Sequence, residues 1–362
     1  MKESLIWHAG EQVLSRIRDG GLSAKDVSIV AGAAGGPKWL ILRHLDAALC
    51  GNWFAGRTEK LFLLGASIGA WRFAAWCKPD PVSALSDFEA AYLDQYYAKP
   101  PTAAEVTDES LRIQRAYLGE AGPREILDHP VFRLNCMSVR CRALARLDAK
   151  PILGPAIVCS ALANAVHRKL LGFFFERVLF SDPRDVPPFH AMNGFPLQQV
   201  ALTPQNLSQA LLASGSIPLV MSGVRNIPGA RPGAYRDGGL IDYHLDVPFN
   251  PPEGTIALFP HFGERIVPGW FDKWLPKRTP SREHLRSVLL VAPSRELIAR
   301  LPLGKISDRT DFERFFGRDD ERLAYWRAVL DAGRILADAF MEAVESGSIR
   351  NKVRPFPPGS VH

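Results

Sequence analysis

The sequence predicts an α/β protein with a mainly parallel central sheet. Two stretches carry this prediction: an apolar strand is followed by a tight loop and a helix at residues 27–50, and the same order recurs at residues 61–76. Strand–loop–helix units at such short spacing are typical of a parallel sheet covered by helices. The composition agrees, since 47% hydrophobic and 23% charged residues are ordinary for a globular chain and exclude a disordered one.

In the first part of the chain, a short helix precedes the first strand. The helix after that strand begins near Pro37, which suits a first helical turn, and its apolar residues recur at helical spacing. The second strand leads into a helix that is apolar nearly all round. The expected ranges are Glu11–Arg18, Val27–Gly32, Pro37–Cys50, Leu61–Leu64 and Ile68–Trp76.

In the remainder of the chain, residues 81–130 look helical, with breaks at Pro and Gly. Pro204 is expected to open a helix capped by Thr203, and residues 225–236 to form a loop. The other expected elements are strands at Phe132–Cys136, Thr255–Phe259 and Ser287–Ala292 and a helix at Glu321–Glu345. No linker is visible, so we expect one domain over 1–362, with a core at about 25–250 and a helical C-terminal extension at about 251–362.

Charge and cysteine content exclude several classes of protein. The net charge is +6, and residues 261–362 contribute +4 of this charge. The chain contains no basic run with interleaved aromatic residues, so we expect no nucleic-acid partner. The five cysteines contain no C-x-x-C pair, so we expect buried reduced thiols, no metal and a cytoplasmic location. No apolar run reaches the roughly 18–20 residues needed to span a bilayer, and the N-terminus is no secretory signal.

The second strand–helix junction carries the best candidate for a catalytic residue. Gly65-Ala66-Ser67-Ile68-Gly69 matches G-x-S-x-G, in which a sharp turn exposes a serine at the carboxyl end of a strand. Gly65 and Gly69 let the neighbouring backbone approach without a clash. The alternative interpretation is a tight turn whose serine only caps a helix.

A nucleophilic serine needs donors for the oxyanion that it creates. The upstream loop Gly35-Gly36-Pro37-Lys38 also follows a buried strand, and glycine amides at the start of a helix suit an anion. A phosphate-binding loop is the rival interpretation, but Pro37 and Trp39 break its pattern. The third interpretation is a turn of small residues that only allows a helix to pack against the sheet.

A base is required as well. Asp237-Gly238-Gly239 follows a loop and a short expected strand and offers a carboxylate, although Asp-Gly also marks ordinary surface turns. Three histidines downstream of Ser67 are alternative bases for a Ser–His–Asp triad: His190, His244 and His261.

Taken in chain order, these three motifs resemble those of the patatin-like phospholipases. The stretch from Ala213 to Pro218 is similar to a further family segment, so the resemblance covers about residues 25–250. The glycine run is shorter than usual, with Ala34 at one glycine position, and Trp39 replaces the small residue that usually follows the basic one. Residues 153–180 look like an insertion, and the last hundred match nothing assignable.

The resemblance implies a three-layer α/β/α fold and a lipid acyl hydrolase with a Ser67–Asp237 dyad. Gly35, Gly36 and Lys38 would form the oxyanion hole, and no metal or organic cofactor is needed. The expected partners are an acyl-ester substrate and, transiently, a membrane surface, with the apolar segments Leu170–Phe180 and Ile256–Trp274 lining an acyl channel or touching lipid. A catalytically inactive lipid-binding protein on the same fold and a nucleotide-binding module are the alternatives from other classes.

Overall fold

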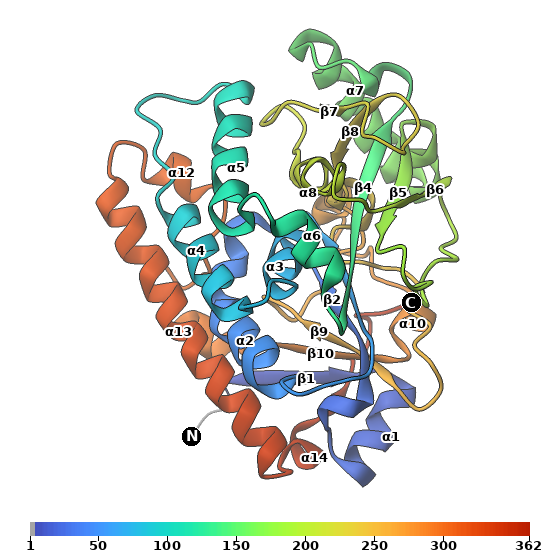
Figure 1. Cartoon of the computed structure of the whole chain (residues 1–362), viewed down its shortest axis with the longest axis vertical. Coiled ribbons are helices and arrows are strands. Elements are labelled where there is room, and N and C mark those ends of the chain that lie inside the picture. Colours follow the sequence, from blue (N-terminus) through green and yellow to red (C-terminus); the bar gives the residue numbers. More distant parts are fainter. Residues whose placement is uncertain (1–3) are drawn as a thin grey trace.

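The computed structural model describes residues 4–362, in which eleven strands form one sheet (Figure 1). Its order is β11-β1-β10-β9-β2-β3-β4-β5-β6, and β8 joins β4 to β7. The strands from β10 to β4 run parallel, whereas β1, β5 and β8 run antiparallel to neighbours. The strands are β1 (Leu5–Ala9), β2 (Val27–Gly32), β3 (Leu61–Ala66), β4 (Phe132–Cys141), β5 (Phe175–Ser181), β6 (Leu197–Ala201), β7 (Val224–Arg225), β8 (Ala234–Asp237), β9 (Ile256–Pro260), β10 (Val288–Pro293) and β11 (Arg354–Pro355).

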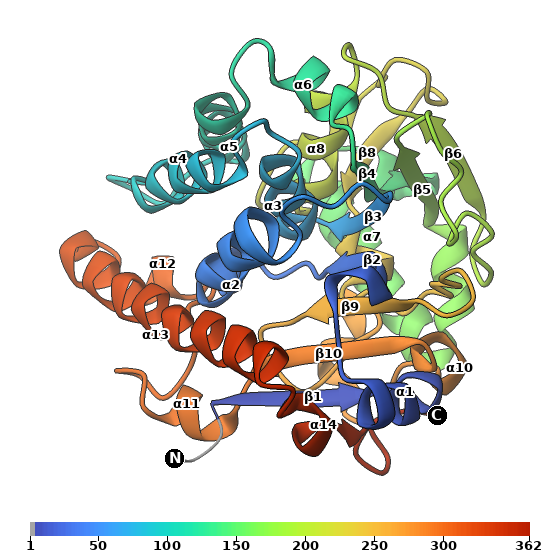
Figure 2. The ribbon, with the colours of Figure 1, turned by 60° about the horizontal axis from the view of Figure 1, so that its bottom comes forward.

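Helices flank this sheet, which confirms the predicted α/β class. Figure 2 shows α2, α3, α4 and α13 together on one side of it. The main helices are α1 (Glu11–Gly20), α2 (Arg43–Ala48), α3 (Ile68–Trp76), α4 (Pro81–Leu93), α5 (Ala103–Leu118), α6 (Gly122–Asp128), α7 (Lys150–Val166), α8 (Leu207–Gly215) and α13 (Asp319–Glu345). Shorter ones are α9 (Gly239–Asp242), α10 (Arg282–Leu285), α11 (Arg295–Ala299), α12 (Asp311–Arg314) and α14 (Ile349–Lys352).

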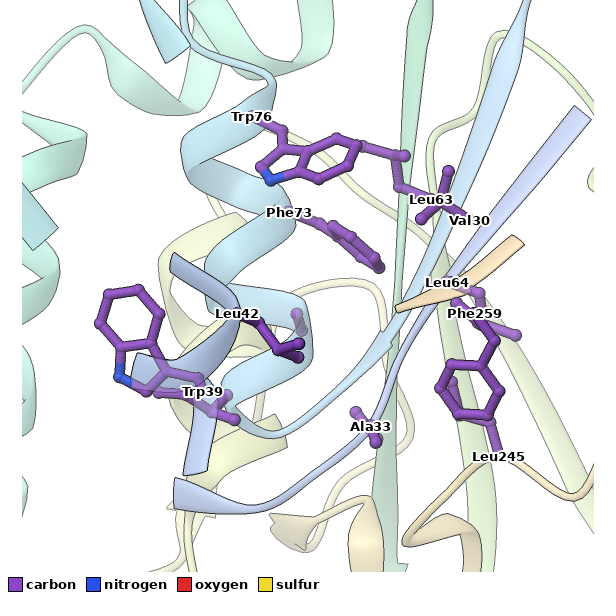
Figure 3. Packing of buried hydrophobic residues seen from close by; sticks show 14 of the residues in the cluster. Val30, Ala33, Trp39, Leu42, Leu63, Leu64, Phe73, Trp76, Leu245 and Phe259 are labelled. Carbon is purple, nitrogen blue, oxygen red and sulfur yellow. The ribbon is translucent and has the colours of Figure 1, made fainter. Parts of the chain in front are cut away.

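The helix α3 is the centre of the core, because all nine of its residues are buried. Phe73 and Trp76 lie against Leu63 and Val30 of the sheet (Figure 3), and none of these four side chains has exposed surface. Burying a large apolar side chain contributes about 1.5–3 kcal/mol. The position of the residue before α3 is therefore determined by a rigid, fully packed element.

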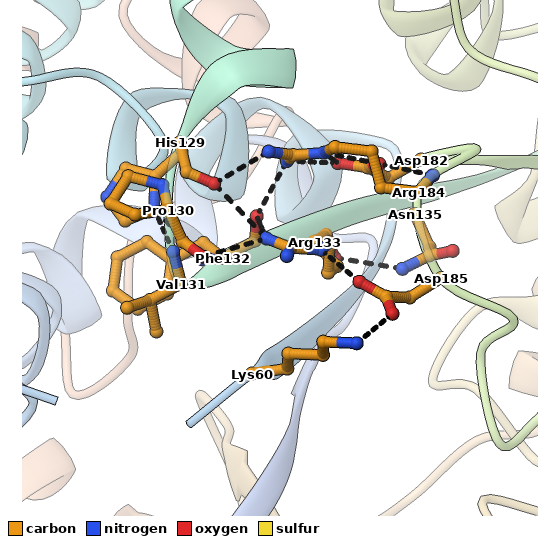
Figure 4. Close-up of polar contacts among 10 residues, drawn as sticks. All are labelled: Lys60, His129, Pro130, Val131, Phe132, Arg133, Asn135, Asp182, Arg184 and Asp185. Atoms are coloured by element: carbon orange, nitrogen blue, oxygen red, sulfur yellow. Dashed lines mark hydrogen bonds and ion pairs between the residues drawn. The ribbon is translucent and has the colours of Figure 1, made fainter. Parts of the chain in front are cut away.

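A network of polar contacts lies where β3 and β4 begin (Figure 4). Asp185 accepts a hydrogen bond from Arg133 Nε at 2.6 Å and pairs with Lys60, which precedes β3. Arg184 donates to the carbonyl of His129 at 2.9 Å and pairs with Asp182 at 2.6 Å. These contacts hold the entry to β3 and β4 at the opposite end from Ser67.

Most expected elements are confirmed, among them Val27–Gly32 and Ile68–Trp76, with the same bounds. The expected helix Pro37–Cys50 is instead divided into a 3₁₀ segment, η2 (Gly36–Leu42), the short α2 and a π segment, η3 (Leu49–Trp53). The helix expected to begin at Pro204 begins later, at Leu207, because residues 204–206 form a turn. The Thr203 hydroxyl accepts from the Asn206 N–H at 3.3 Å, as expected of a cap, and Asn206 Oδ1 accepts from the Thr203 N–H at 2.8 Å.

Four further corrections concern the rest of the chain. The C-terminal extension is not simply helical, because β9 pairs with β2 and β10 with β9 inside the sheet. Strands β1, β5, β6, β7 and β11 were not expected, and the expected loop at 225–236 contains most of β8, the short strand expected before Asp237. Four cysteines are buried as expected, but Cys159 is exposed.

Candidate active site

Ser67 sits in the turn between β3 and α3 with φ of 54° and ψ of −126°, a left-handed conformation that costs energy in a residue with a side chain. The flanking glycines make the turn sterically feasible. A Cβ on Gly65 would lie 2.4 Å from the Ala70 nitrogen, and one on Gly69 would lie 2.1 Å from the Gly32 carbonyl oxygen. The glycines of the motif are thus required by close backbone packing.

Asp237 reaches Ser67 because two strands share one edge of β4. On that edge β3 ends with Ala66 opposite Met137, and β8 ends with Asp237 opposite the next residue, Ser138. Since β8 runs antiparallel to β4, β3 and β8 point toward each other. The Ser67 hydroxyl donates to Asp237 Oδ2 at 2.7 Å, across 170 positions of sequence.

Ser214, at the end of α8, holds this junction together. Its hydroxyl donates to the Met137 carbonyl at 2.6 Å and accepts from the Ser67 N–H at 2.9 Å. The Ser214 carbonyl accepts from the Gly238 N–H at 3.2 Å. One fully buried side chain therefore connects β4 and the Ser67 turn, and its backbone reaches the turn after Asp237.

The Asp237 carboxylate is nearly buried, with 7% of its surface exposed. Loss of solvation raises its pKa to about 6, while hydrogen bonds from the Ser67 hydroxyl and the Gly239 N–H and the charges of Arg309 and Lys273 oppose the rise. The Gly239 N–H donates to Oδ1 at 2.7 Å, which leaves Oδ2 for the serine. A pKa near neutrality suits a carboxylate to proton transfer.

The loop after β2 lies close to Ser67 and Asp237, since Gly35, Gly36 and Lys38 line the same cavity as both residues. The Ala34 N–H donates to the Tyr243 carbonyl at 2.9 Å, but within residues 4–362 the Gly35 and Gly36 N–H groups have no hydrogen-bond acceptor. Gly36 has a φ of +57°, which favours glycine. Lys38 Nζ lies 4.9 Å from the centre of the Phe262 ring, and its pKa is lowered mainly by burial.

The three histidines expected as alternative bases hydrogen-bond elsewhere. His190 Nδ1 lies 3.0 Å from the Pro187 carbonyl oxygen, and His244 Nδ1 accepts from the Val267 N–H at 2.9 Å. His261 Nδ1 contacts the Gly263 carbonyl at 2.5 Å. His244 and His261 are buried and stack edge to face, and burial lowers the pKa of both.

Two cavities meet at Ser67. The first, of about 480 Å³, is mainly apolar, and its wall includes Trp71, Tyr92, Ile113, Met221 and Phe312. Many of its residues come from α4, α5, α12 and the loop before α5. The second, of about 320 Å³, is more polar and includes Gly35, Gly36 and Asp237. Apolar clefts with a few convergent polar groups are typical ligand sites.

Two cations that sequence reasoning missed border the polar cavity, Lys273 and Arg309. Lys273 Nζ lies 4.0 Å from the centre of the Tyr243 ring, and burial together with the charges of Lys38 and Arg309 lowers its pKa to about 7. Both residues come from the last third of the chain, where no motif marks them. The basic excess of that segment was the one available signal.

Of the two segments expected to line an acyl channel or touch lipid, Leu170–Phe180 borders neither cavity at Ser67, and its second half is the buried strand β5. From Ile256–Trp274, Trp270 and Lys273 border the polar cavity, and residues 262–265, Val267 and Lys273 line a third cavity of about 460 Å³. The expected acyl channel is therefore wrong for the apolar cavity, and contact of either segment with lipid stays a prediction. The apolar cavity uses α4 and α5 instead, whose sequences look like ordinary amphipathic helices.

Within residues 4–362, no group of three or more His, Cys, Asp or Glu side chains could hold a metal ion. No helix among these residues is long and apolar enough to cross a membrane.

Comparisons with known proteins identify no family, since no family model and no curated protein matches the chain. Among solved structures, VipD from Legionella pneumophila is 11% identical with a TM-score of 0.35, over 94% of this chain and 71% of that one. Human GIVD cytosolic phospholipase A2 is 11% identical with a TM-score of 0.38, over 97% of this chain and 67% of that one. Such distant likenesses assign no reaction, so the function is inferred from the chain's own site.

Proposed function

We propose that the protein is a serine acyl hydrolase that cleaves carboxylic esters of lipids, with Ser67 as nucleophile and Asp237 as base. The observation that carries the proposal is the 2.7 Å hydrogen bond from a serine in a strained, fully packed turn to a buried carboxylate of raised pKa. Activated nucleophiles are commonly recognised by such a contact with a base.

In the proposed reaction Asp237 accepts the hydroxyl proton as Ser67 Oγ bonds to the ester carbonyl carbon. The resulting oxyanion is stabilised by the Gly35 and Gly36 N–H groups, with Lys38 adding positive charge nearby. The carbonyl reforms, the C–O bond to the alcohol breaks, and the alcohol leaves with the proton from Asp237. Water, deprotonated by Asp237, then attacks the acyl carbon. The bond between that carbon and Ser67 Oγ breaks, Asp237 returns the proton to Ser67, and the fatty acid leaves.

The cavities support a lipid with an anionic head group. The apolar cavity would hold the acyl chain, and the polar cavity would hold the alcohol part. Lys38, Lys273 and Arg309 border the polar cavity, and among the described residues none of them forms an ion pair. Asp308 lines the same cavity, but it forms an ion pair with Lys305 and accepts hydrogen bonds from Thr310. A phosphate on the substrate would compensate these cations, so a phospholipase A activity fits best.

The test is covalent labelling by a fluorophosphonate probe together with hydrolysis of short p-nitrophenyl esters. We expect both for the unmodified protein and neither for Ser67→Ala. Labelling that persists in Ser67→Ala would disprove the assignment. A protein that binds lipid but shows neither reaction would be a lipid-binding protein without turnover. A loss of several thousandfold on replacing His190, His244 or His261 by Ala would favour a triad.

A further inference from the structure

Helix α7 is apolar on both of its faces. From Pro151 to Val166 it contains no charged residue. One face packs on the protein through residues spaced three or four apart, namely Leu153, Ala156, Ile157, Ser160 and Asn164, all of them buried. A helix that is hydrophobic all round is normally covered on every side, by protein or by lipid.

Within residues 4–362, nothing covers the outer face of α7 in this way. Val158, Leu162 and Val166 are 59%, 64% and 79% exposed, and Phe173, in the following segment η5 (Arg168–Phe173), is 71% exposed. Val158, Leu162 and Val166, which are four residues apart and so share one face of the helix, are called the α7 patch below. Figure 1 shows α7 at the periphery, at the end of the molecule where β7 and β8 lie. Large apolar side chains gathered on one surface indicate an interaction site.

The stretch of chain that contains the α7 patch is mainly basic. Residues 142–175 contain a single acidic side chain, Asp148, which pairs with Arg225 and Arg236. The basic side chains in this stretch are Arg142, Arg146, Lys150, Arg168 and Lys169. Of these, Arg168 pairs with Asp272, and the other four are exposed. Exposed apolar groups flanked by Lys and Arg favour a surface of anionic lipid.

Helix α7 and the residues after it contact a segment that borders the site around Ser67. The Asn164 amide donates to Asp272 Oδ1 at 2.7 Å, and Arg168 pairs with the same carboxylate at 3.3 Å. Asp272 belongs to the 3₁₀ segment η6 (Trp270–Trp274), whose Trp270 and Lys273 border the polar cavity. Its last residue, Trp274, is 64% exposed.

We propose that the α7 patch docks the protein on the surface of a bilayer that contains anionic lipids. The apolar side chains enter the boundary between head groups and acyl chains, and the flanking cations lie among the head groups. Through the contacts of Asp272, this docking places the polar cavity near the lipid surface. Docking does not depend on the reaction, since nothing in the α7 patch takes part in it.

The exposed Cys159 provides a direct probe, because it lies beside Val158 and the other four cysteines are buried. An environment-sensitive fluorophore attached there in the full chain should shift its emission to shorter wavelength when vesicles of phosphatidylcholine with phosphatidylserine are added. Phosphatidylcholine alone should give a weaker response, and added salt should reduce it. A spectrum unchanged by either kind of vesicle would overturn the proposal.

Vesicle sedimentation tests the α7 patch by substitution. Val158→Ser/Leu162→Ser/Val166→Ser should weaken binding by about tenfold or more, because the buried apolar area sets the affinity. Losing the cations in Lys150→Gln/Lys169→Gln should cost about fivefold per charge on anionic vesicles. The matched control is Val186→Ser/Leu303→Ser/Ile335→Ser, whose parent side chains are 74%, 37% and 43% exposed elsewhere. Equal binding by the α7 and control variants would refute docking through α7.

Two further results distinguish membrane docking from dimerisation and from the proposed reaction. If sedimentation velocity shows a dimer that the α7 variant abolishes, a second copy of the chain covers the patch and the membrane proposal fails. Ser67→Ala should bind vesicles as the unmodified protein does. A protein that binds vesicles but hydrolyses no ester would refute the proposed reaction alone, whereas one that hydrolyses soluble esters but binds no vesicle would refute the docking alone.

Discussion

Ser67 and Asp237 lie at the facing ends of β3 and β8, which occupy the same edge of β4 from opposite directions. Their 2.7 Å contact is therefore a property of the sheet rather than of either loop. A reactive pair built on strands and on a buried helix is held with little freedom, which is the condition for precise proton transfer.

The pH dependence of hydrolysis follows from Asp237. As the proposed base, Asp237 must be ionised, and burial raises its pKa to about 6. We therefore expect kcat/KM to rise with pH through a midpoint near 6 and to level off above it. The profile is measured with a neutral ester whose own charge does not change. A midpoint near 4, or activity that falls as the pH rises through 6, would contradict the role.

As the pH rises and Asp237 ionises, the stability of the fold should change in the opposite direction from activity. A folded-state pKa above the unfolded value means that the folded protein binds the proton more tightly, so ionisation of Asp237 costs stability between about pH 4 and pH 6. Asp237→Asn should accordingly be inactive and yet have a higher Tm than the unmodified protein at pH 8. A lower Tm for Asp237→Asn would show that the ionised carboxylate stabilises the fold.

Ser214→Ala tests the residue that positions the nucleophile. The substitution leaves the Ser67 N–H and the Met137 carbonyl without their partner, at a cost of about 1–3 kcal/mol for each buried group. We expect kcat to fall by about tenfold or more with little change in KM, because the turn is displaced and the cavities are not. Ser160→Ala is the control, since that buried serine bonds only within α7. Equal kcat in both variants would exclude a positioning role.

Gly69→Ala should destabilise the protein although alanine favours helices. The added methyl group would lie 2.1 Å from the Gly32 carbonyl oxygen, and neither backbone can move without displacing the sheet. We expect a loss of about 1–3 kcal/mol or more in unfolding free energy. In Gly154→Ala the new methyl group meets nothing within 4 Å, so this control should gain about 0.5–1 kcal/mol. Thermal unfolding of both variants measures the contrast.

Lys273→Met/Arg309→Met tests the head-group assignment. For an acyl ester whose alcohol carries a phosphate we expect KM to rise about tenfold or more, since hydrogen bonds to charged groups contribute about 1.5–3 kcal/mol. KM for a neutral p-nitrophenyl ester should stay within about twofold. Arg300→Met, at an exposed position, should change neither value. A parallel rise in KM for both esters would instead indicate a general distortion of the cavity.

The buried pair of Asp46 and Arg72 should support the rigidity of α3. Arg72 donates twice to Asp46 at 2.6 Å, and both side chains are almost completely buried. Asp46→Ala leaves an unpaired buried guanidinium, so we expect a loss of about 3–5 kcal/mol in denaturant unfolding. Adding Arg72→Met should recover part of it. A double variant as unstable as the sum of its parts would show that the two side chains do not interact.

Local patterns were enough to predict the α/β class, the strand at 27–32, the turn at Ser67 and the buried helix after it. Each depends on neighbouring residues alone: an apolar run of strand length, glycines where the backbone crowds, and a helix apolar all round. Asp237 was also singled out, but from a motif, and its motif is equally typical of a surface turn.

Other features could not be read from the chain, because they depend on which distant segments pair. Only the strand order sets β8 against Ser138 and so brings Asp237 to Ser67. The apolar cavity forms only because α4, α5 and α12 pack together. Lys273 and Arg309 reach the polar cavity only through the path of the last hundred residues. The physical reason is that periodicity specifies which face of an element is buried, whereas the partner that buries it is selected by the free energy of the whole fold.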